Sequence, residues 1–463
     1  MSMTKHSYHN DPWVFTNLEE LVPQDHLVRK MDRCMDWKFI YPLIDNLYSD
    51  IGRPSIDPVV LFKMIILNIA FGYNSMRRTC REIEVNVAYR WYLGLSLNGK
   101  VPNYSTWSQN YIRRFKDSSI FDEIFTKILE QAIRRGFVDM SSVFGDSTHQ
   151  KASANKNRYE DEEIEIVKRH YDDELLEEIN AVRKEKGKKP IKEIKKSEIV
   201  FDEETGEEKE VEKKKHVKKS KTDPDAGLFH KGEKQKCYAY SQHVFSDKNG
   251  FVIHANTFPG NLHDSTIFFK AYDELISKHG EYIDYICLDA GYKSPAICRE
   301  IIKRGKEPVL PYKRPMTKKG FFKKYEFQYV EDFDYYVCPN NEVLKFSTVT
   351  RDGYRQYKSD HKKCEYCPFL DKCTKSKNHQ KIISRHVWED YLERAEEIRH
   401  SDTFKEIYPK RKETVERIFA EDKENHNLRF TRLRGLEKNR KQGLMIFSVH
   451  NFLKIARWSW KGV

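Results

Sequence analysis

The sequence has no apolar run long enough to cross a bilayer. Its longest such run, residues 59–73, contains Lys63 and Asn68, whereas a membrane-spanning helix needs about 20 mostly apolar residues. The N-terminus also lacks the charged, apolar and small-residue order of a signal peptide. We therefore expect a soluble, cytoplasmic protein with no membrane partner.

Cysteine is scarce and odd in number, with nine in 463 residues. Together with the lack of an export signal, this argues against a disulfide framework and leaves thiols free for packing or for metal. The chain shows no internal repeat. Among its 26 tyrosines, none stands out as a nucleophile inside an arginine cluster, which argues against recombination through a protein–DNA covalent bond.

Basic residues exceed acidic ones. Lys and Arg number 83 against 71 Asp and Glu, for a formal net charge of +12, which favours an anionic partner such as nucleic acid. The surplus is concentrated at the end of the chain, because residues 410–463 hold 14 Lys and Arg against 6 Asp and Glu. This tail is predicted to lie along a phosphate backbone. The length of the chain allows two to four domains.

Residues 1–125 are predicted to form a small helical domain, because apolar residues such as Leu18, Leu21 and Leu27 recur at helical spacing. Its later part has a helix over residues 80–93, a turn, and a second helix that Ser105 can cap. The second helix carries Arg113 and Arg114, as in a helix-turn-helix that recognises DNA. A plain helical hairpin with surface arginines is the alternative.

From about residue 138 the pattern changes to strands alternating with helices, which predicts a mixed α/β domain. Two segments interrupt it. Residues 160–222 hold 20 acidic and 17 basic side chains and are predicted to be a solvated or disordered insertion. One helix face within it can be lined by Ile164, Tyr171, Leu175, Ile179 and Val182. Residues 313–405 are predicted to be irregular and contain four cysteines.

Carboxylates at strand ends are the main candidates for catalysis. Cleavage and rejoining of DNA need two divalent ions about 4 Å apart, and Mg²⁺ prefers carboxylate oxygens. Asp146 ends an apolar strand, and Asp289 ends another before a tight Ala-Gly-Tyr turn. A helix over residues 411–423 offers Glu413, Glu416 and Glu421 as the third acid. Helical spacing does not choose among these three.

These segments together resemble the DDE transposases of bacterial insertion sequences, in the group with the pattern Tyr-x2-Arg-x3-Glu-x6-Lys. Glu416 and Lys423 have the six-residue gap, Lys412 occupies the arginine position beside Arg411, and Tyr408 is one residue too far upstream. The resemblance covers nearly the whole chain. The other matching segments are residues 22–29, 52–58, 102–106, 145–148, 259–264, 288–292, 434–437 and 451–454.

The resemblance implies a helical N-terminal domain followed by an RNase H-like catalytic core with two insertions. The implied segments are a DNA-binding domain (1–125), the start of the core (126–159), a charged insertion (160–222), more core (223–312), a cysteine-containing insertion (313–405) and a basic helical segment completing the core (406–463). Asp146, Asp289 and Glu416 would be ligands of two Mg²⁺ ions, with Mn²⁺ as a substitute. No covalent protein–DNA intermediate is implied.

The implied partner is double-stranded DNA, both the terminal inverted repeats and the target, bound by a homodimer at the nucleoid of a bacterial cell. Lys423, with Arg411 or Lys412, would contact phosphate near the cleaved strand, although Lys423 can equally be a solvated lysine. Lys438, Arg440 and Lys441 would hold phosphate along the tail. The alternatives are a nuclease of the same fold without strand transfer and a DNA-binding protein that has lost catalysis.

Two further groups remain open. His263 and Asp264 precede a predicted helix, where Asp264 is a helix cap or a ligand of metal or DNA. Cys338, Cys364, Cys367 and Cys373 can close a tetrahedral Zn²⁺ site that stiffens the second insertion, with His361 able to replace one ligand. A loose cluster of reduced thiols is the alternative.

Overall fold

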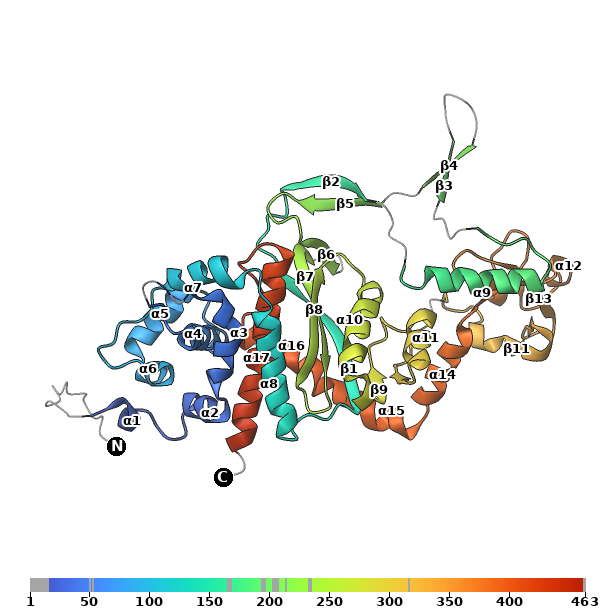
Figure 1. The fold of residues 1–463 in the computed structure, drawn as a ribbon. Coiled ribbons are helices and arrows are strands. Elements are labelled where there is room, and N and C mark those ends of the chain that lie inside the picture. Colours follow the sequence, from blue (N-terminus) through green and yellow to red (C-terminus); the bar gives the residue numbers. More distant parts are fainter. Residues whose placement is uncertain are drawn as a thin grey trace, which may run out of the picture.

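The computed structural model describes residues 16–49, 51, 54–164, 169–192, 197–201, 208–212, 215–231, 235–314 and 317–460. Figure 1 shows helices at the N-terminal side, a sheet in the middle and a second sheet at the far side. In the described residues no helix has the length and apolar character that a membrane span requires.

The N-terminal part is helical, as predicted. Its α-helices are α1 (Leu18–Leu21), α2 (Leu27–Cys34), α3 (Ile40–Ile44), α4 (Pro58–Ala70), α5 (Met76–Val85), α6 (Val87–Leu93), α7 (Tyr104–Asn110) and α8 (Ile120–Arg134). The single helix predicted over residues 80–93 is two helices, because the Asn86 side chain accepts hydrogen bonds from Ala88 N and Tyr89 N and starts α6. Asn103 rather than Ser105 caps α7, by accepting from Ser105 N.

The central sheet contains β1 (Ser142–Lys151), β6 (Gly227–Lys231), β7 (Gln235–Ser246), β8 (Val252–Pro259), β9 (Tyr285–Cys287) and β10 (Glu307–Val309). β1 pairs antiparallel with β7, which pairs antiparallel with β8. On its other edge β1 pairs parallel with β9, and β9 with β10. The helices α10 (Asp264–His279) and α11 (Pro295–Lys303) connect the last three strands of this series. The antiparallel strands β1, β7 and β8, followed by β9 and β10 parallel to β1, form the predicted RNase H-like core. β6 pairs antiparallel with β7 beside them.

The basic C-terminal tail is a central helix and not a surface arm. α17 (Leu436–Ser459) has 15 buried residues among its 24. It packs against α8, β8, α2 and α4, so it joins the helical part to the sheet (Figure 1). Before it, α16 (Val415–Asn425) packs against β1. The charge of the tail predicted that it lies along a phosphate backbone, and the family resemblance implied a helical segment that completes the core. Its apolar residues outweigh the charge in deciding where the helix lies.

The charged insertion contains regular structure. β2 (Tyr159–Ile164) pairs with β5 (Lys215–Ser220), and β3 (Ser197–Phe201) pairs with β4 (Glu208–Glu212). The helix α9 (Asp172–Glu185) buries Leu175, Ile179 and Val182, as predicted, whereas Ile164 ends β2 instead. Residues 165–168, 193–196, 202–207 and 213–214 of the insertion lie outside the described part.

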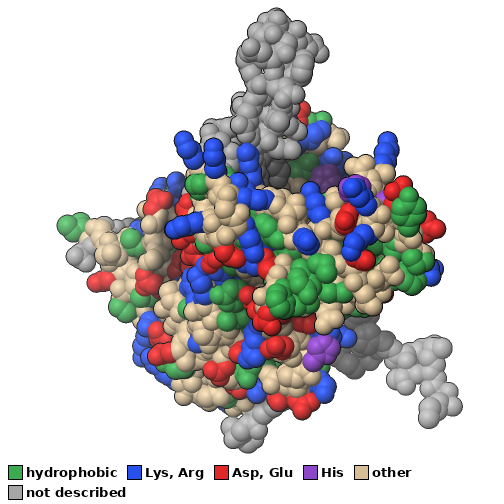
Figure 2. All heavy atoms as spheres, turned by 90° about the vertical axis from the view of Figure 1, so that its right-hand side faces the viewer, with side chains coloured by type: hydrophobic (Ala, Val, Ile, Leu, Met, Phe, Trp, Pro, Cys, Tyr) green, Lys and Arg blue, Asp and Glu red, His purple; other side chains and the backbone are tan. Residues whose placement is uncertain are grey.

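The second insertion is a five-stranded antiparallel sheet, so the prediction of an irregular stretch was wrong. Its strands are β11 (Gln328–Val330), β12 (Tyr335–Val337), β13 (Val343–Val349), β14 (Tyr354–Lys358) and β15 (Ile382–His386). They enclose a small core of Phe327, Tyr336, Leu344, Tyr357 and Ile383. On this side of the molecule, basic, acidic and hydrophobic side chains are interspersed (Figure 2). α14 (Glu389–Arg399) and α15 (Asp402–Ile407) lead back to the core.

Candidate active site

Two of the predicted acids lie at the same edge of the sheet. The parallel pairing of β1 with β9 ends at Phe144 and Cys287. Asp146 and Asp289 each lie two residues beyond this pairing, Asp146 within β1 and Asp289 just after the end of β9. Neighbouring strands are about 4.8 Å apart, and the charge of Asp289 acts on Asp146. The fold therefore brings these two carboxylates together, although 143 positions separate them in the numbering.

The third acid reaches this edge from the first turn of α16. Glu416 Oε1 accepts a hydrogen bond from Arg411 Nη1 at 2.6 Å, and Arg411 Nη2 donates to Asp146 Oδ2. The Arg411 side chain is only 8% exposed, against 46% for Glu416. One buried guanidinium thus stands between the first and third acids. Among Glu413, Glu416 and Glu421, only Glu416 shares an ion pair with it in the described residues.

The structure also separates Arg411 from Lys412. The short helix Tyr408–Lys412 keeps Tyr408 and Arg411 three residues apart, the spacing of the family pattern, and one extra residue follows before Glu416. The backbone accommodates the extra residue at Thr414, which has irregular dihedral angles (φ −106°, ψ −104°) just before α16. Lys412 is exposed. Arg411 therefore takes the arginine position that the sequence pattern alone gave to Lys412.

The environment of Asp146 disfavours its charge. Burial raises the pKa of Asp146 to about 6, against the opposing charge of Arg411, and the carboxylates of Asp289 and Asp264 add to the increase. Ser147 N donates to Asp146 Oδ1 at 2.8 Å and favours the ionised form. A site that accumulates negative charge in this way is suited to bind a cation.

Asp264 belongs to this neighbourhood, which the sequence left undecided. His263 caps α10 by accepting from Ser265 N, so Asp264 is not the cap. Its Oδ1 instead accepts a hydrogen bond from Ser147 Oγ at 2.6 Å. The position of Asp264 beside β1 depends on how α10 packs on the sheet. Only its place after a strand, in a loop entering a helix, was a signal in the sequence.

The comparisons with protein families agree with this geometry. A transposase DDE domain model matches residues 337–456, which include Arg411 and Glu416, and a transposase domain (DUF772) model matches residues 16–113. Over these two segments the chain is similar to transposases of the DDE type. No curated protein and no solved structure matches it.

Carboxylate oxygens, which these three acids offer, are the ligands that Mg²⁺ prefers. Within the described part of the chain, however, no three His, Cys, Asp or Glu side chains are arranged to hold an ion. The Arg411 guanidinium stands between two of the three acids. That a single cation already bridges Asp146 and Glu416 shows that these carboxylates converge on one position.

The basic residues that were expected to contact DNA differ in solvent accessibility. Lys423 follows Glu416 by two turns of α16, on the same face, and is partly buried. Arg113 is exposed. Arg114, by contrast, donates to Leu47 O at 3.2 Å and to Asn110 Oδ1 at 2.6 Å, so its guanidinium holds the helical part together.

The three tail residues expected to hold phosphate are also unequal. The Lys441 side chain is 4% exposed and donates to the carbonyl groups of Phe115 and Lys116. Arg440 donates to both carboxylate oxygens of Asp122, at 2.7 and 3.0 Å. Only Lys438 is exposed without an ion pair in the described residues. Burial of α17 therefore removes Lys441 from any surface that DNA can reach.

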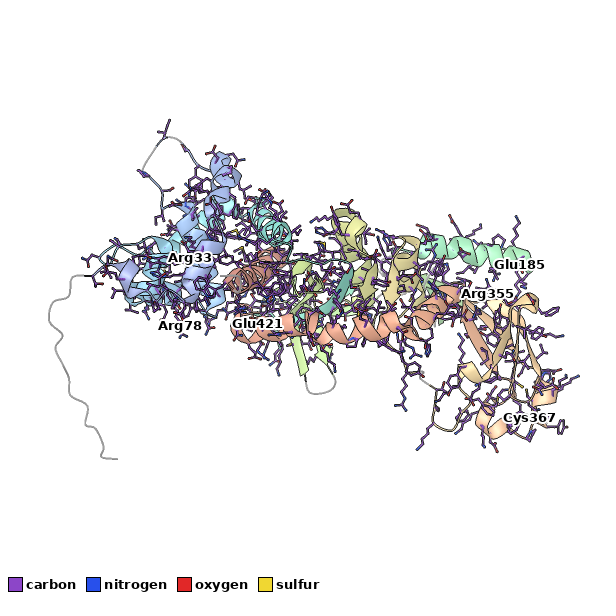
Figure 3. The ribbon with its side chains drawn as sticks, turned by 90° about the horizontal axis from the view of Figure 1, so that it is seen from below. Arg33, Arg78, Glu185, Arg355, Cys367 and Glu421 are labelled. Carbon is purple, nitrogen blue, oxygen red and sulfur yellow. The ribbon has the colours of Figure 1, made fainter. Side chains whose placement is uncertain are left out.

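The four cysteines lie far from the acids. In Figure 3, Cys367 lies at the far end of the second sheet, while Glu421 of α16 lies near the middle of the molecule. Burial raises the pKa of Cys373, and the charges of the other three thiols act in the same direction, so the four are neighbours. Cys338 Sγ accepts from Asn340 N and Glu342 N at 3.3 and 3.4 Å. They are not arranged to hold a metal, so the structure gives the zinc prediction no support.

Proposed function

We propose that this transposase binds the terminal inverted repeats of an insertion sequence and catalyses metal-dependent cleavage and strand transfer with Asp146, Asp289 and Glu416. The observation that carries the proposal is their convergence at one sheet edge from β1, β9 and α16, with Arg411 bonded to the first and the third. These acids come from distant parts of the chain, and a purely structural role does not require them to meet.

In the proposed mechanism, the three carboxylates would hold two Mg²⁺ or Mn²⁺ ions, which would supply activation of the attacking oxygen and stabilisation of the leaving oxygen. In cleavage, a water oxygen bonds to phosphorus, and the 3′ oxygen leaves and takes up a proton. In strand transfer, that 3′-hydroxyl oxygen loses its proton and bonds to a target phosphorus, whose own 3′ oxygen leaves. Lys423 would hold phosphate oxygens of the cleaved strand, and so would Arg411 once its guanidinium has left Asp146 and Glu416.

The helical N-terminal part would recognise the repeats. Support comes from Arg113, which is exposed next to α7, and from Arg77, whose guanidinium donates to Tyr104 Oη at 2.8 Å on the outer side of that helix. Contacts with base edges carry specificity. In the full chain, Arg113→Ala should therefore reduce the preference for a repeat over random duplex, by roughly tenfold for one base contact. Equal preference before and after the change would remove Arg113 from the recognition surface.

The test of catalysis uses Asp146→Asn, Asp289→Asn and Glu416→Gln in the full chain. Each should abolish excision and leave binding to element ends within about threefold of wild type, because phosphate contacts supply most of the affinity. The matched control is Glu413→Gln, an exposed carboxylate just before α16, which should cut normally. Near-normal excision by any of the three variants would remove that acid from the site.

The same assay separates the two alternative functions. A nuclease would release 3′-hydroxyl ends that never join target DNA, whereas an inactive DNA-binding protein would bind repeats without metal-dependent cleavage. Action as a homodimer remains a prediction, and the mass of the protein bound to one repeat would test it.

A further inference from the structure

A basic groove lies at the base of the β2–β5 ribbon, apart from the three acids. It has a volume of about 610 Å³ and is lined by Asn157, Arg158, Tyr159, Lys221, Thr222 and Arg434. The cations come from three segments: the loop after β1, the end of β5, and the loop before α17. In Figure 1 the ribbon leaves the central sheet near the start of α17.

The three cations of this groove form no salt bridges in the described part of the chain, although Asp223 and Asp225 accept hydrogen bonds from the backbone N–H groups of Gly435 and Leu436, next to Arg434. Arg158, Lys221 and Arg434 are exposed and form no ion pair within the described residues, and no carboxylate lines the groove. Further along the same ribbon, by contrast, Lys219 pairs with Glu162 at 3.0 Å. Three unpaired cations around one concave surface repel each other, so the arrangement favours a ligand with several negative charges.

The groove is held in shape by backbone contacts. Lys221 N donates to Arg158 O at 3.0 Å, and Arg434 Nε donates to Ser153 O at 3.2 Å. The second contact uses one guanidinium nitrogen of Arg434 and leaves the other two to face a ligand. Because these hydrogen bonds tie the segments together, the distances between the cations are fixed. Fixed distances suit a DNA backbone, whose phosphates are also regularly spaced.

The groove is linked to the active site along β1. β1 carries Asp146 and ends at Lys151, which is exposed and is tied to the loop before α17 through Lys151 N and Arg429 O at 3.1 Å. Five strand residues span about 16 Å. At about 3.4 Å for each base pair, a duplex cut beside Asp146 reaches the groove roughly five or more base pairs from the cut.

We propose that this groove binds the phosphate backbone of duplex DNA flanking the cleaved phosphate, through Arg158, Lys221 and Arg434. The proposal rests on the transposase function and adds a surface that the three acids do not define. The duplex comes from the element end or from the target, since both present the same phosphates. Tyr159, Asn157 and Thr222 add polar contacts without selecting bases.

The test is a salt titration of binding without metal ions, so that cleavage plays no part. The triple change Arg158→Gln, Lys221→Gln and Arg434→Gln should reduce the slope of log affinity against log salt by about 3, and Lys221→Gln alone by about 1. Near 0.1 M salt each lost contact should weaken binding by roughly tenfold. The control removes three charges from the second insertion, with Lys319→Gln, Lys362→Gln and Lys377→Gln, and should leave the slope unchanged.

Two arms distinguish the sources of the duplex. A reduced slope with a duplex carrying the terminal repeat assigns the groove to the element end. The groove is assigned to the target if the triple variant shows a normal slope with the repeat duplex but needs about tenfold or more target DNA to join pre-cut ends.

Normal behaviour in both arms, with unchanged thermal melting, would overturn the proposal. An equal effect of the control triple would also overturn it, because net charge would then explain the result. If the wild-type chain itself does not bind the repeat, the proposed function fails rather than the groove.

Discussion

Arg411 Nη1 lies 2.6 Å from Glu416 Oε1, in an ion pair near the point where the pairing of β1 with β9 ends and Asp146 and Asp289 follow. The same guanidinium contacts Asp146. If a divalent ion binds between these acids, it must take the position that a cation of the chain itself occupies. We therefore predict that the metal and Arg411 compete for this position.

This competition predicts that Arg411→Gln binds metal more tightly than wild type. Removal of the internal cation leaves Asp146 and Glu416 without a partner, so their affinity for Mn²⁺ should increase about tenfold, or ~1.4 kcal/mol. Calorimetric titration of the DNA-free protein measures it. Lys412→Gln is the matched control, because this neighbour is exposed and contacts neither acid. Equal or weaker affinity in Arg411→Gln would show that the ion pair does not oppose metal binding.

Asp264 is predicted to position Asp146. Its Oδ1 accepts from Ser147 Oγ, and Ser147 N in turn donates to Asp146 Oδ1. Loss of such a supporting contact costs about 10- to 100-fold in metal affinity or activity, so Asp264→Ala and Ser147→Ala should both cut slowly and need more metal for half-maximal cleavage. Asp264→Asn keeps an accepting oxygen and should recover most of the activity.

Ser277→Ala, an exposed change on the same helix α10, is the control for these variants and should behave as wild type. If Asp264→Asn were as slow as Asp264→Ala, the charge of Asp264 rather than its hydrogen bond would be the active feature, and the positioning role would be refuted.

Zinc binding by Cys338, Cys364, Cys367 and Cys373 stays a prediction of the sequence. If it is correct, purified protein that has never met a chelator contains about one Zn²⁺ for each chain, and Cys367→Ser lowers both the metal content and the melting temperature. Cys237→Ser, a change on β7 outside the cluster, should do neither. Protein free of zinc would leave the four residues as reduced thiols.

His386 predicts a loss of stability in acid. Burial lowers its pKa to about 4, and Nδ1 accepts from Trp388 N at 3.1 Å, which requires the neutral ring. Because the folded pKa lies below the ordinary value of about 6.5, this stability is present above pH 6.5 and is lost as the pH falls toward 4. The loss is at most about 3 kcal/mol.

Urea unfolding at pH 7.5 and 4.5 checks this expectation. His386→Asn offers an oxygen to the same N–H group and does not titrate, so its stability should depend less on pH than that of wild type. His361→Asn, at an exposed position, should keep the wild-type dependence. The explanation fails if the three proteins lose the same stability between the two pH values.

Several features were predictable because they are local. The apolar strands that lead to Asp146 and Asp289 and the helical spacing of residues 415–425 are properties of short segments, and the structure contains these elements. The predicted strand ends were wrong, because β1 continues past Asp146 to Lys151 and β9 ends at Cys287. The buried face of α9 was predicted from the same periodicity. The break between α5 and α6 was missed, because one side-chain cap at Asn86 outweighs the helical pattern around it.

The sequence by itself predicted the acids and their order, the strand–helix alternation and the resemblance to transposases, since these follow from residue patterns within short stretches. Only the tertiary structure decided that Arg411 rather than Lys412 bonds to the acids, that Asp264 bonds to Ser147, and that Lys441 is buried against the carbonyl groups of Phe115 and Lys116. The physical reason is that α17, apolar over most of its length, packs between the helical part and the sheet. Burial there fixes which charges face solvent, and no local pattern of charge contains that information.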